Sequence, residues 1–176
     1  MNVIRLQKGF TVIEVLIVIS IIGILLSFVV PMGGRAKTKA REARARAEIA
    51  ALETAISAYY TDMGTYPTDN PGAQNETSNA VVIKHLSGRD YTQAGYPYVN
   101  AIINDANWNG PYMEFDANNI SGGGAFVDPW SNAYIIQIDL DGDVSTTPPT
   151  NNALSYDIAS NGKDGAAGGG DDITNY

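Results

Sequence analysis

The sequence predicts an α+β fold in which one long N-terminal α-helix packs on a small antiparallel β-sheet. Three observations predict it. Residues 15–32 form an apolar run without a charged side chain, and residues 35–58 are rich in alanine and other strong helix formers. Two short segments with the composition or alternation of strands, 134–138 and 153–158, follow in the second half. Because two or three strands alone are marginally stable, residues 47–59 of the helix must cover one face of the sheet.

The apolar run forms the front of the helix and predicts a transmembrane segment over residues 10–34. Its uncharged part approaches the roughly 20 residues needed to cross a bilayer core. Glu14 is the one charge that interrupts it. A carboxylate at that depth costs about 2.5–3.5 kcal/mol on insertion scales, so it needs a partner or a function. Residues 1–9 are a short basic leader that lacks the cleavage site of an ordinary secretory signal.

The helix is expected to continue to Asp62, with a kink near Pro31, because proline removes a helical hydrogen bond. Gly64 should end it. Glu42 and Arg46 have the spacing of a supporting i,i+4 ion pair. Apolar side chains at three- and four-residue spacing give the amphipathic face: Ala47, Ala50, Ala51, Leu52, Ala55, Ile56 and Tyr59.

The second half of the chain predicts a smaller set of elements. Residues 80–86 favour a short helix over a strand. Beside the two predicted strands, a third is expected near 112–115. Trp130 is expected to anchor the core. Residues 139–143 (Asp-Leu-Asp-Gly-Asp) are similar to the start of an EF-hand loop, but the glycine and the twelfth residue do not fit, so a polar turn is favoured over a weak cation site.

Composition and charge exclude several classes of function. There is no cysteine, which excludes disulfides and thiolate metal sites, and the single His85 argues against a zinc enzyme or a Ser/His/Asp triad. Beyond Thr54 the chain has three basic and fifteen acidic residues, a surface that repels nucleic acid and attracts cations. Six of the eleven basic residues lie within residues 35–46, where lipid phosphates or a neighbouring acidic surface are the expected partners.

Several motifs together resemble a known family. Residues 9–14 (Gly-Phe-Thr-Val-Ile-Glu) resemble the processing site of type IV pilin-like proteins. The Asp-Pro-Trp segment 128–130 and the acidic tail 160–176 are most similar to the major pseudopilins of type II secretion systems. Residues 69–109 match poorly, and residues 131–133 are Ser-Asn-Ala where that family more often has Gly-Asn-Pro.

The resemblance implies a type IV pilin-like fold and a structural, non-enzymatic function. A prepilin peptidase would cut between Gly9 and Phe10, often with methylation of the new amine. Copies of the chain would polymerise into a helical pseudopilus that drives export of folded proteins, together with an inner-membrane assembly platform and minor pseudopilins. A type IV pilin for adhesion, motility or DNA uptake is the alternative, although most such pilins carry a C-terminal cysteine pair.

The resemblance also implies a location and a division of the chain. Residues 1–9 would be the cleaved leader on the cytoplasmic side, and residues 10–34 a single pass through the bacterial inner membrane, held in lipid before assembly. Residues 35–176 would form the periplasmic domain, including the second half of the helix.

Two sites carry the expected function. Glu14 would pair with the freed amine of Phe10 on a neighbouring subunit, which fixes the subunit's axial position; the alternative is a helix-end residue near the headgroups. The acidic tail would bind Ca²⁺ through Asp164, Asp171 and Asp172, helped by Ser160 and backbone carbonyls, since calcium takes six to eight oxygens from flexible loops. The alternative is a solvated polar tail.

Overall fold

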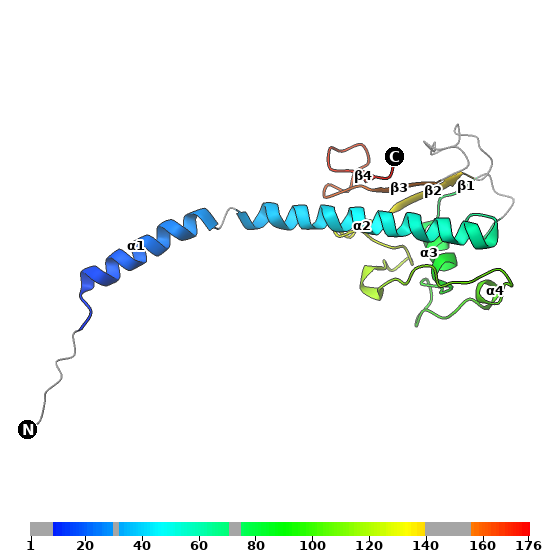
Figure 1. Ribbon diagram of the computed structural model, residues 1–176, viewed down its shortest axis with the longest axis horizontal. Helices are drawn as coiled ribbons and strands as arrows, with labels where there is room; N and C mark the ends of the chain where they lie inside the picture. Colours follow the sequence, from blue (N-terminus) through cyan, green and yellow to red (C-terminus); the bar gives the residue numbers. More distant parts are fainter. Residues whose placement is uncertain (1–8, 30–31, 71–74, 140–155) are drawn as a thin grey trace, which may run out of the picture. The chain divides into compact units, whose positions relative to one another are not determined.

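The computed structural model describes residues 9–29, 32–70, 75–139 and 156–176 (Figure 1). The chain divides into two compact units, Met1–Ala40 and Arg41–Tyr176. The elements, in chain order, are α1 (Val12–Val29), α2 (Met32–Met63), β1 (Asn75–Glu76), α3 (Asn79–Ser87), α4 (Asn100–Ile103), the 3₁₀ turn η1 (Ala117–Asn119), β2 (Ile135–Asp139), β3 (Tyr156–Ser160) and β4 (Ile173–Thr174).

The predicted long helix is present as α1 and α2, and its end is where the sequence places it. Gly64 adopts φ 70°, and its N–H donates to the carbonyl of Tyr60 at 2.9 Å, so a left-handed glycine closes α2. The predicted membrane span over 10–34 includes residues 30–31, which lie outside the described residues. Among the helices that the structure describes, none combines the length and the apolar character needed to cross a membrane.

The sheet has four antiparallel strands in the order β1-β2-β3-β4. The predicted strands over 134–138 and 153–158 are confirmed as β2 and β3, with residues 153–155 outside the described part of the chain, and the predicted helix over 80–86 is confirmed as α3. The third strand predicted near 112–115 is wrong: the N–H of Tyr112 donates to the carbonyl of Leu86 at 2.8 Å, so this segment pairs with the end of α3 instead.

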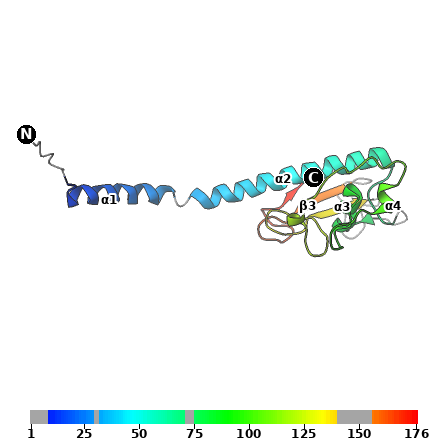
Figure 2. The ribbon, with the colours of Figure 1, turned by 90° about the horizontal axis from the view of Figure 1, so that it is seen from below.

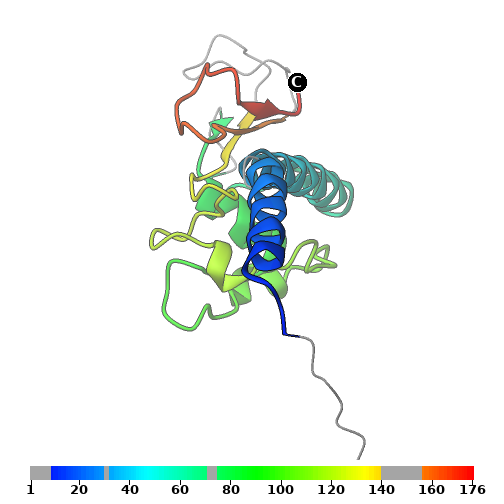
Figure 3. The same ribbon diagram turned by 90° about the vertical axis from the view of Figure 1, so that its left-hand side faces the viewer.

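The core joins α2, α3 and the sheet. Its buried residues on α2 follow helical spacing: Ala45, Ile49, Leu52, Ala55, Ile56 and Tyr59. They pack with Val82, Ile83 and Leu86 of α3 and with the isoleucines of β2 and β3. In Figure 2, α3 and β3 lie against the second half of α2, and Figure 3 shows the second unit from another side. Ala47, Ala50 and Ala51, predicted on this face, are exposed, because alanine is accepted on either face of a helix. Trp130 is half-buried and packs against the core.

His85 links three parts of the second unit. Its Nδ1 lies 3.1 Å from the Tyr59 hydroxyl on α2, and its Nε2 lies 2.9 Å from Oδ1 of Asp69 in the loop after α2. Lys84 pairs with the same carboxylate. Burial lowers the pKa of His85 from its ordinary 6.5, and this outweighs the hydrogen bond to Asp69, which raises it.

This histidine predicts a loss of stability on acidification. With a folded-state pKa below 6.5, the unfolded chain binds more protons, so stability falls as the pH drops below about 6.5. We expect the urea midpoint to be lower at about pH 5.5 than at about pH 7.5, and His85→Gln to remove most of that difference. The chain has no other histidine. If the urea midpoint of His85→Gln fell between these two pH values as much as that of the wild type, His85 would not be the cause of the loss of stability.

Candidate assembly and cation sites

The start of α1 is held by a reciprocal cap between Thr11 and Glu14. The backbone N–H and the hydroxyl of Thr11 both donate to Oε2 of Glu14 at 2.8 Å, and the N–H of Glu14 lies 3.3 Å from the Thr11 hydroxyl oxygen. This is a capping box, in which an N-cap threonine and a glutamate three residues later satisfy each other's backbone groups. The pattern Thr-x-x-Glu before an apolar run is the sequence signal for it, which the prediction of the helix start missed.

Around this cap, the predicted processing site is open. Gly9 and Phe10 precede the first helical residue, Val12, and both are exposed, Phe10 at 85%. A bond in such a segment is accessible to a peptidase, whereas a bond inside a helix is not. The structure therefore places Phe10 and Glu14 at the same end of α1.

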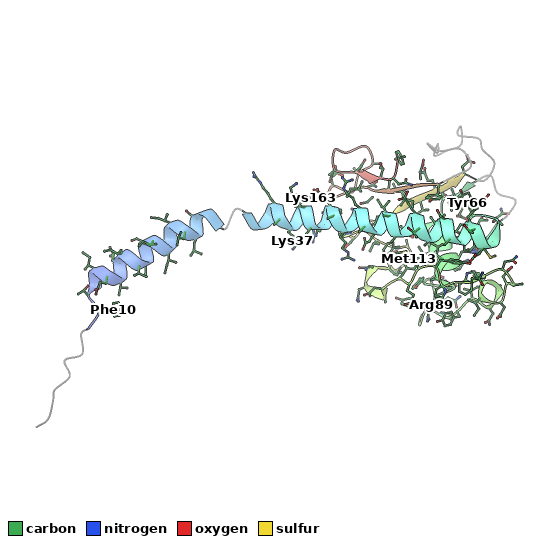
Figure 4. The ribbon with its side chains drawn as sticks, viewed as in Figure 1. Phe10, Lys37, Tyr66, Arg89, Met113 and Lys163 are labelled. Atoms are coloured by element: carbon green, nitrogen blue, oxygen red, sulfur yellow. The ribbon has the colours of Figure 1, made fainter. Side chains whose placement is uncertain are left out.

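The rest of α1 presents apolar side chains on all sides (Figure 4). Its large aliphatic residues from Val12 to Leu26 are about half exposed or more, and no described residue buries them. An apolar surface of this extent marks a site of contact with lipid or protein, because a soluble monomer rarely leaves one open to water.

The second candidate site is the C-terminal loop that joins β3 to β4. One carboxylate oxygen from each of Asp164, Asp171 and Asp172 lies within 4.8 Å of the others. Glycines make this convergence possible: a Cβ at Gly169 would lie 2.8 Å from Oδ2 of Asp164 and 3.0 Å from Oδ1 of Asp171. Gly162 has φ 61°, a conformation that favours glycine, and its Cβ would collide with the Asp171 carbonyl oxygen.

Backbone donors orient these carboxylates without neutralising them. Asp171 Oδ2 accepts from the N–H groups of Lys163 at 2.6 Å and Asp164 at 3.1 Å, and the N–H of Gly168 donates to Oδ2 of Asp172 at 2.7 Å. The hydrogen bond from Asp164, followed by that from Lys163, lowers the pKa of Asp171. Oδ1 of Asp172 is buried and has no hydrogen-bond partner among the described residues. Three charged carboxylates with one buried free oxygen fit a hard cation such as Ca²⁺.

Ser160, predicted to help bind the cation, directs its hydroxyl elsewhere. It donates to Oδ2 of Asp128 at 2.6 Å and accepts from the N–H of Gly162 at 3.1 Å. The other oxygen of Asp128 accepts from the N–H groups of Trp130 and Asn132, both at 2.9 Å. The structure thus assigns Ser160 a positioning function: it ties the Asp-Pro-Trp turn to the start of the acidic loop.

Two further predictions concern charged residues. Of segment 139–143, only Asp139 is among the described residues, and it is buried at the end of β2. The polar turn favoured for the rest of this segment lies outside the described residues.

On α2, the predicted pair of Glu42 with Arg46 is absent from the described ion pairs. The pair formed there instead is Arg44 Nε with Glu48 Oε1, at 2.8 Å.

Comparison with known proteins gives two family matches. The prokaryotic N-terminal methylation motif matches residues 4–30, and the family of type II secretion system protein G matches residues 34–116. The chain is 33% identical to type II secretion system core protein G of Escherichia coli K12 over 97% of this chain and 91% of that protein. The corresponding protein of Vibrio cholerae O1 is 32% identical over 100% and 96%. A fimbrial protein, EcpC of Eikenella corrodens, is 39% identical over 39% of this chain and 45% of that protein.

Proposed function

The chain belongs to the type II secretion system protein G family, the major pseudopilins, and from this premise we propose how its sites serve the pseudopilus. As a pseudopilin it is a structural subunit of type II secretion, and it carries the motif for prepilin peptidase cleavage and methylation. The relatives that cover nearly the whole chain are secretion proteins, whereas the fimbrial match covers less than half of it. This favours the pseudopilus over a surface pilus.

The first step is processing. A prepilin peptidase cuts the exposed bond between Gly9 and Phe10, and methylation modifies the new amine. Two features support this proposal: the N-terminal methylation motif matches here, and both residues precede α1. Glu14 then becomes the fifth residue of the mature chain.

The second step is anchoring and assembly. Before assembly, the apolar side chains of α1 hold the subunit in the inner membrane by a single pass, with residues 35–176 in the periplasm and the leader in the cytoplasm. During assembly the same side chains pack on the α1 helices of other copies, so the apolar surface passes from lipid to protein without exposure to water. The exposed apolar surface of α1 is the observation that carries this proposal.

The third step fixes the register between subunits. The Glu14 carboxylate pairs with the free amine of Phe10 in a neighbouring copy. Because a carboxylate in an apolar bundle is costly unless paired, only the correct axial position is favourable. Assembly also requires minor pseudopilins and an inner-membrane platform. The subunit's contribution is structural and not catalytic.

The C-terminal loop has a stabilising function in this proposal. Asp164, Asp171 and Asp172 would hold a Ca²⁺ ion, which offsets the repulsion among the three carboxylates and fixes β4 against β3. The converging carboxylates and the buried free oxygen of Asp172 support this. Backbone carbonyls of the glycine-rich loop would complete the oxygen ligands.

The proposal predicts a defined mature protein. We expect mass spectrometry of the membrane-bound chain to show Phe10 as its first residue, with a methylated amine. We also expect deletion of the gene to block secretion of exported proteins, with sheared surface pili unaffected. A mature chain that starts at Met1, or intact secretion after deletion, would contradict the proposed function.

A further inference from the structure

A hollow of about 210 Å³ opens among the loops that follow α3. Its walls combine aromatic side chains, among them Tyr96 and Phe115, with two groups of opposite charge, Arg89 and Glu114. Figure 4 labels Arg89 on this side of the second unit. None of the residues that line this hollow belongs to α1 or to the acidic C-terminal loop.

Arg89 is held in one orientation. Its Nη1 donates to the carbonyl of Tyr96 at 3.1 Å, and its Nη2 donates to the hydroxyl of Tyr98 at 2.6 Å. The guanidinium carbon also lies 3.9 Å from the centre of the Tyr98 ring. Arg89 and Tyr98 pair through an isolated β-bridge, and Tyr96 has the positive φ of 48°, which is uncommon for a residue with a side chain. A fixed guanidinium loses little further freedom on binding.

The two charges in the hollow have no ionic partner in the part of the chain that the structure describes. Arg89 is one of three basic residues beyond Thr54, against fifteen acidic ones, yet no described carboxylate lies within 4 Å of it. Glu114, on the same hollow, is exposed and likewise has no cation within that distance among the described residues. An isolated anion would meet Glu114, and an isolated cation would meet Arg89. The hollow therefore suits a surface that carries both charges.

The α2 surface of this chain offers such a pair. Glu42 is half-buried and Arg46 exposed; they lie one turn apart on the same face. They form no ion pair with each other, in contrast to Arg44 with Glu48 two residues further along. One acid and one base, both free of ionic partners among the described residues, thus lie at neighbouring positions on a helix.

We propose that the hollow receives the α2 surface of a second copy, in which Glu42 pairs with Arg89 and Arg46 with Glu114. This inference rests on the proposed function, because filament growth brings copies together. The charge pattern sets the choice of occupant: each group meets an opposite charge, and the reverse orientation of the helix would place like charges together, which is unfavourable.

Cysteine cross-linking tests the contact, because the chain has no cysteine of its own. Arg46→Cys and Glu114→Cys are combined in the full-length protein, since neither side chain makes a hydrogen bond or ion pair among the described residues. Under oxidation in assembled pseudopili we expect a ladder of cross-linked dimers and higher species. The control combines Arg46→Cys with Lys163→Cys, an exposed position on the C-terminal loop, and should give no ladder.

Charge exchange provides the second arm. Arg46→Glu and Glu114→Arg alone should each lower the yield of filaments by roughly tenfold, because like charges then meet across the contact. The double variant should restore most of that yield. The inference would be overturned by filaments that show no cross-link between positions 46 and 114, or by an equal ladder in the control. It would also be overturned if the cross-links joined the subunit only to an exported protein, or if the double variant did not restore the yield of filaments. Absence of wild-type filaments would instead overturn the proposed function.

Discussion

Glu14→Gln is expected to abolish incorporation of the subunit into filaments while leaving the start of α1 capped. Glutamine serves in a capping box as glutamate does, so the bonds with Thr11 can persist. What it lacks is the charge to pair with the amine of Phe10. Loss of one partner of a buried ion pair costs about 3–5 kcal/mol, equivalent to roughly a hundredfold to several thousandfold in subunit docking. The measurement is the amount of sheared filament relative to the amount of subunit in the membrane.

Thr11→Ala provides the matched control. It removes the N-cap side chain and the hydroxyl that donates to Glu14 at 2.8 Å, but it keeps the carboxylate. Loss of an N-cap costs about 1 kcal/mol, so we expect filaments at no less than about one fifth of the wild-type amount. Glu14→Ala loses both the cap and the charge. If Thr11→Ala abolished assembly and Glu14→Gln did not, the carboxylate would matter for capping and not for register.

The sequence predicted the parts of the fold that depend on long, periodic segments. Leu52, Ile56 and Tyr59 are buried where their spacing placed them, and the end of α2 follows from Gly64. The prediction failed where elements are short. β1 and β4 have two residues each, too few for any alternation, and they exist because β2 and β3 present free edges to them.

The third predicted strand failed for a different physical reason. Residues 112–115 have apolar and aromatic composition typical of a strand, but Tyr112 bonds to the end of α3, and Phe115 is buried among other aromatic rings. Composition reports the burial of such a segment and not its hydrogen-bond partner.

The candidate sites divide in the same way. The family resemblance implied that Asp164, Asp171 and Asp172 converge, and they do so within one short glycine-rich segment. The bond between Ser160 and Asp128 joins residues 32 positions apart, so no local pattern predicts it. The contacts of Asn79 with the backbone of Phe126 and Tyr134 span 47 and 55 positions, and no local pattern predicts them either.

Removal of calcium is expected to lower the melting temperature of the protein by about 5–10 °C. A ligand present at a hundredfold excess over its dissociation constant stabilises the folded state by about 2.7 kcal/mol, and a domain of this size gains a few degrees per kcal/mol. The measurement is thermal unfolding of the detergent-solubilised chain in millimolar Ca²⁺ and in excess EGTA. Mg²⁺ should give a smaller shift, because it needs near-octahedral geometry and keeps its water.

Asp171→Asn and Asp105→Asn separate a specific site from general charge screening. Asp171 belongs to the converging carboxylates, whereas Asp105 caps a turn after α4 through the N–H of Asn107 at 2.9 Å. We expect Asp171→Asn to lose most of the calcium-dependent shift and Asp105→Asn to keep it. An unchanged melting temperature in wild-type protein with and without EGTA would remove the calcium proposal.

The change in melting temperature that Asp171→Asn causes in EGTA distinguishes a cation site from a carboxylate that stabilises the loop by itself. Without the ion, Asp164, Asp171 and Asp172 repel one another across less than 4.8 Å, and removal of one charge relieves that repulsion. The backbone N–H groups of Lys163 and Asp164 can still donate to the amide oxygen of an asparagine. Asp171→Asn should therefore melt in EGTA close to the wild-type temperature, because the relief of this repulsion offsets the weaker hydrogen bonds that a neutral oxygen accepts. A lower temperature would mean that the carboxylate stabilises the loop through its hydrogen bonds alone, and the bound cation would not be needed to explain the cluster.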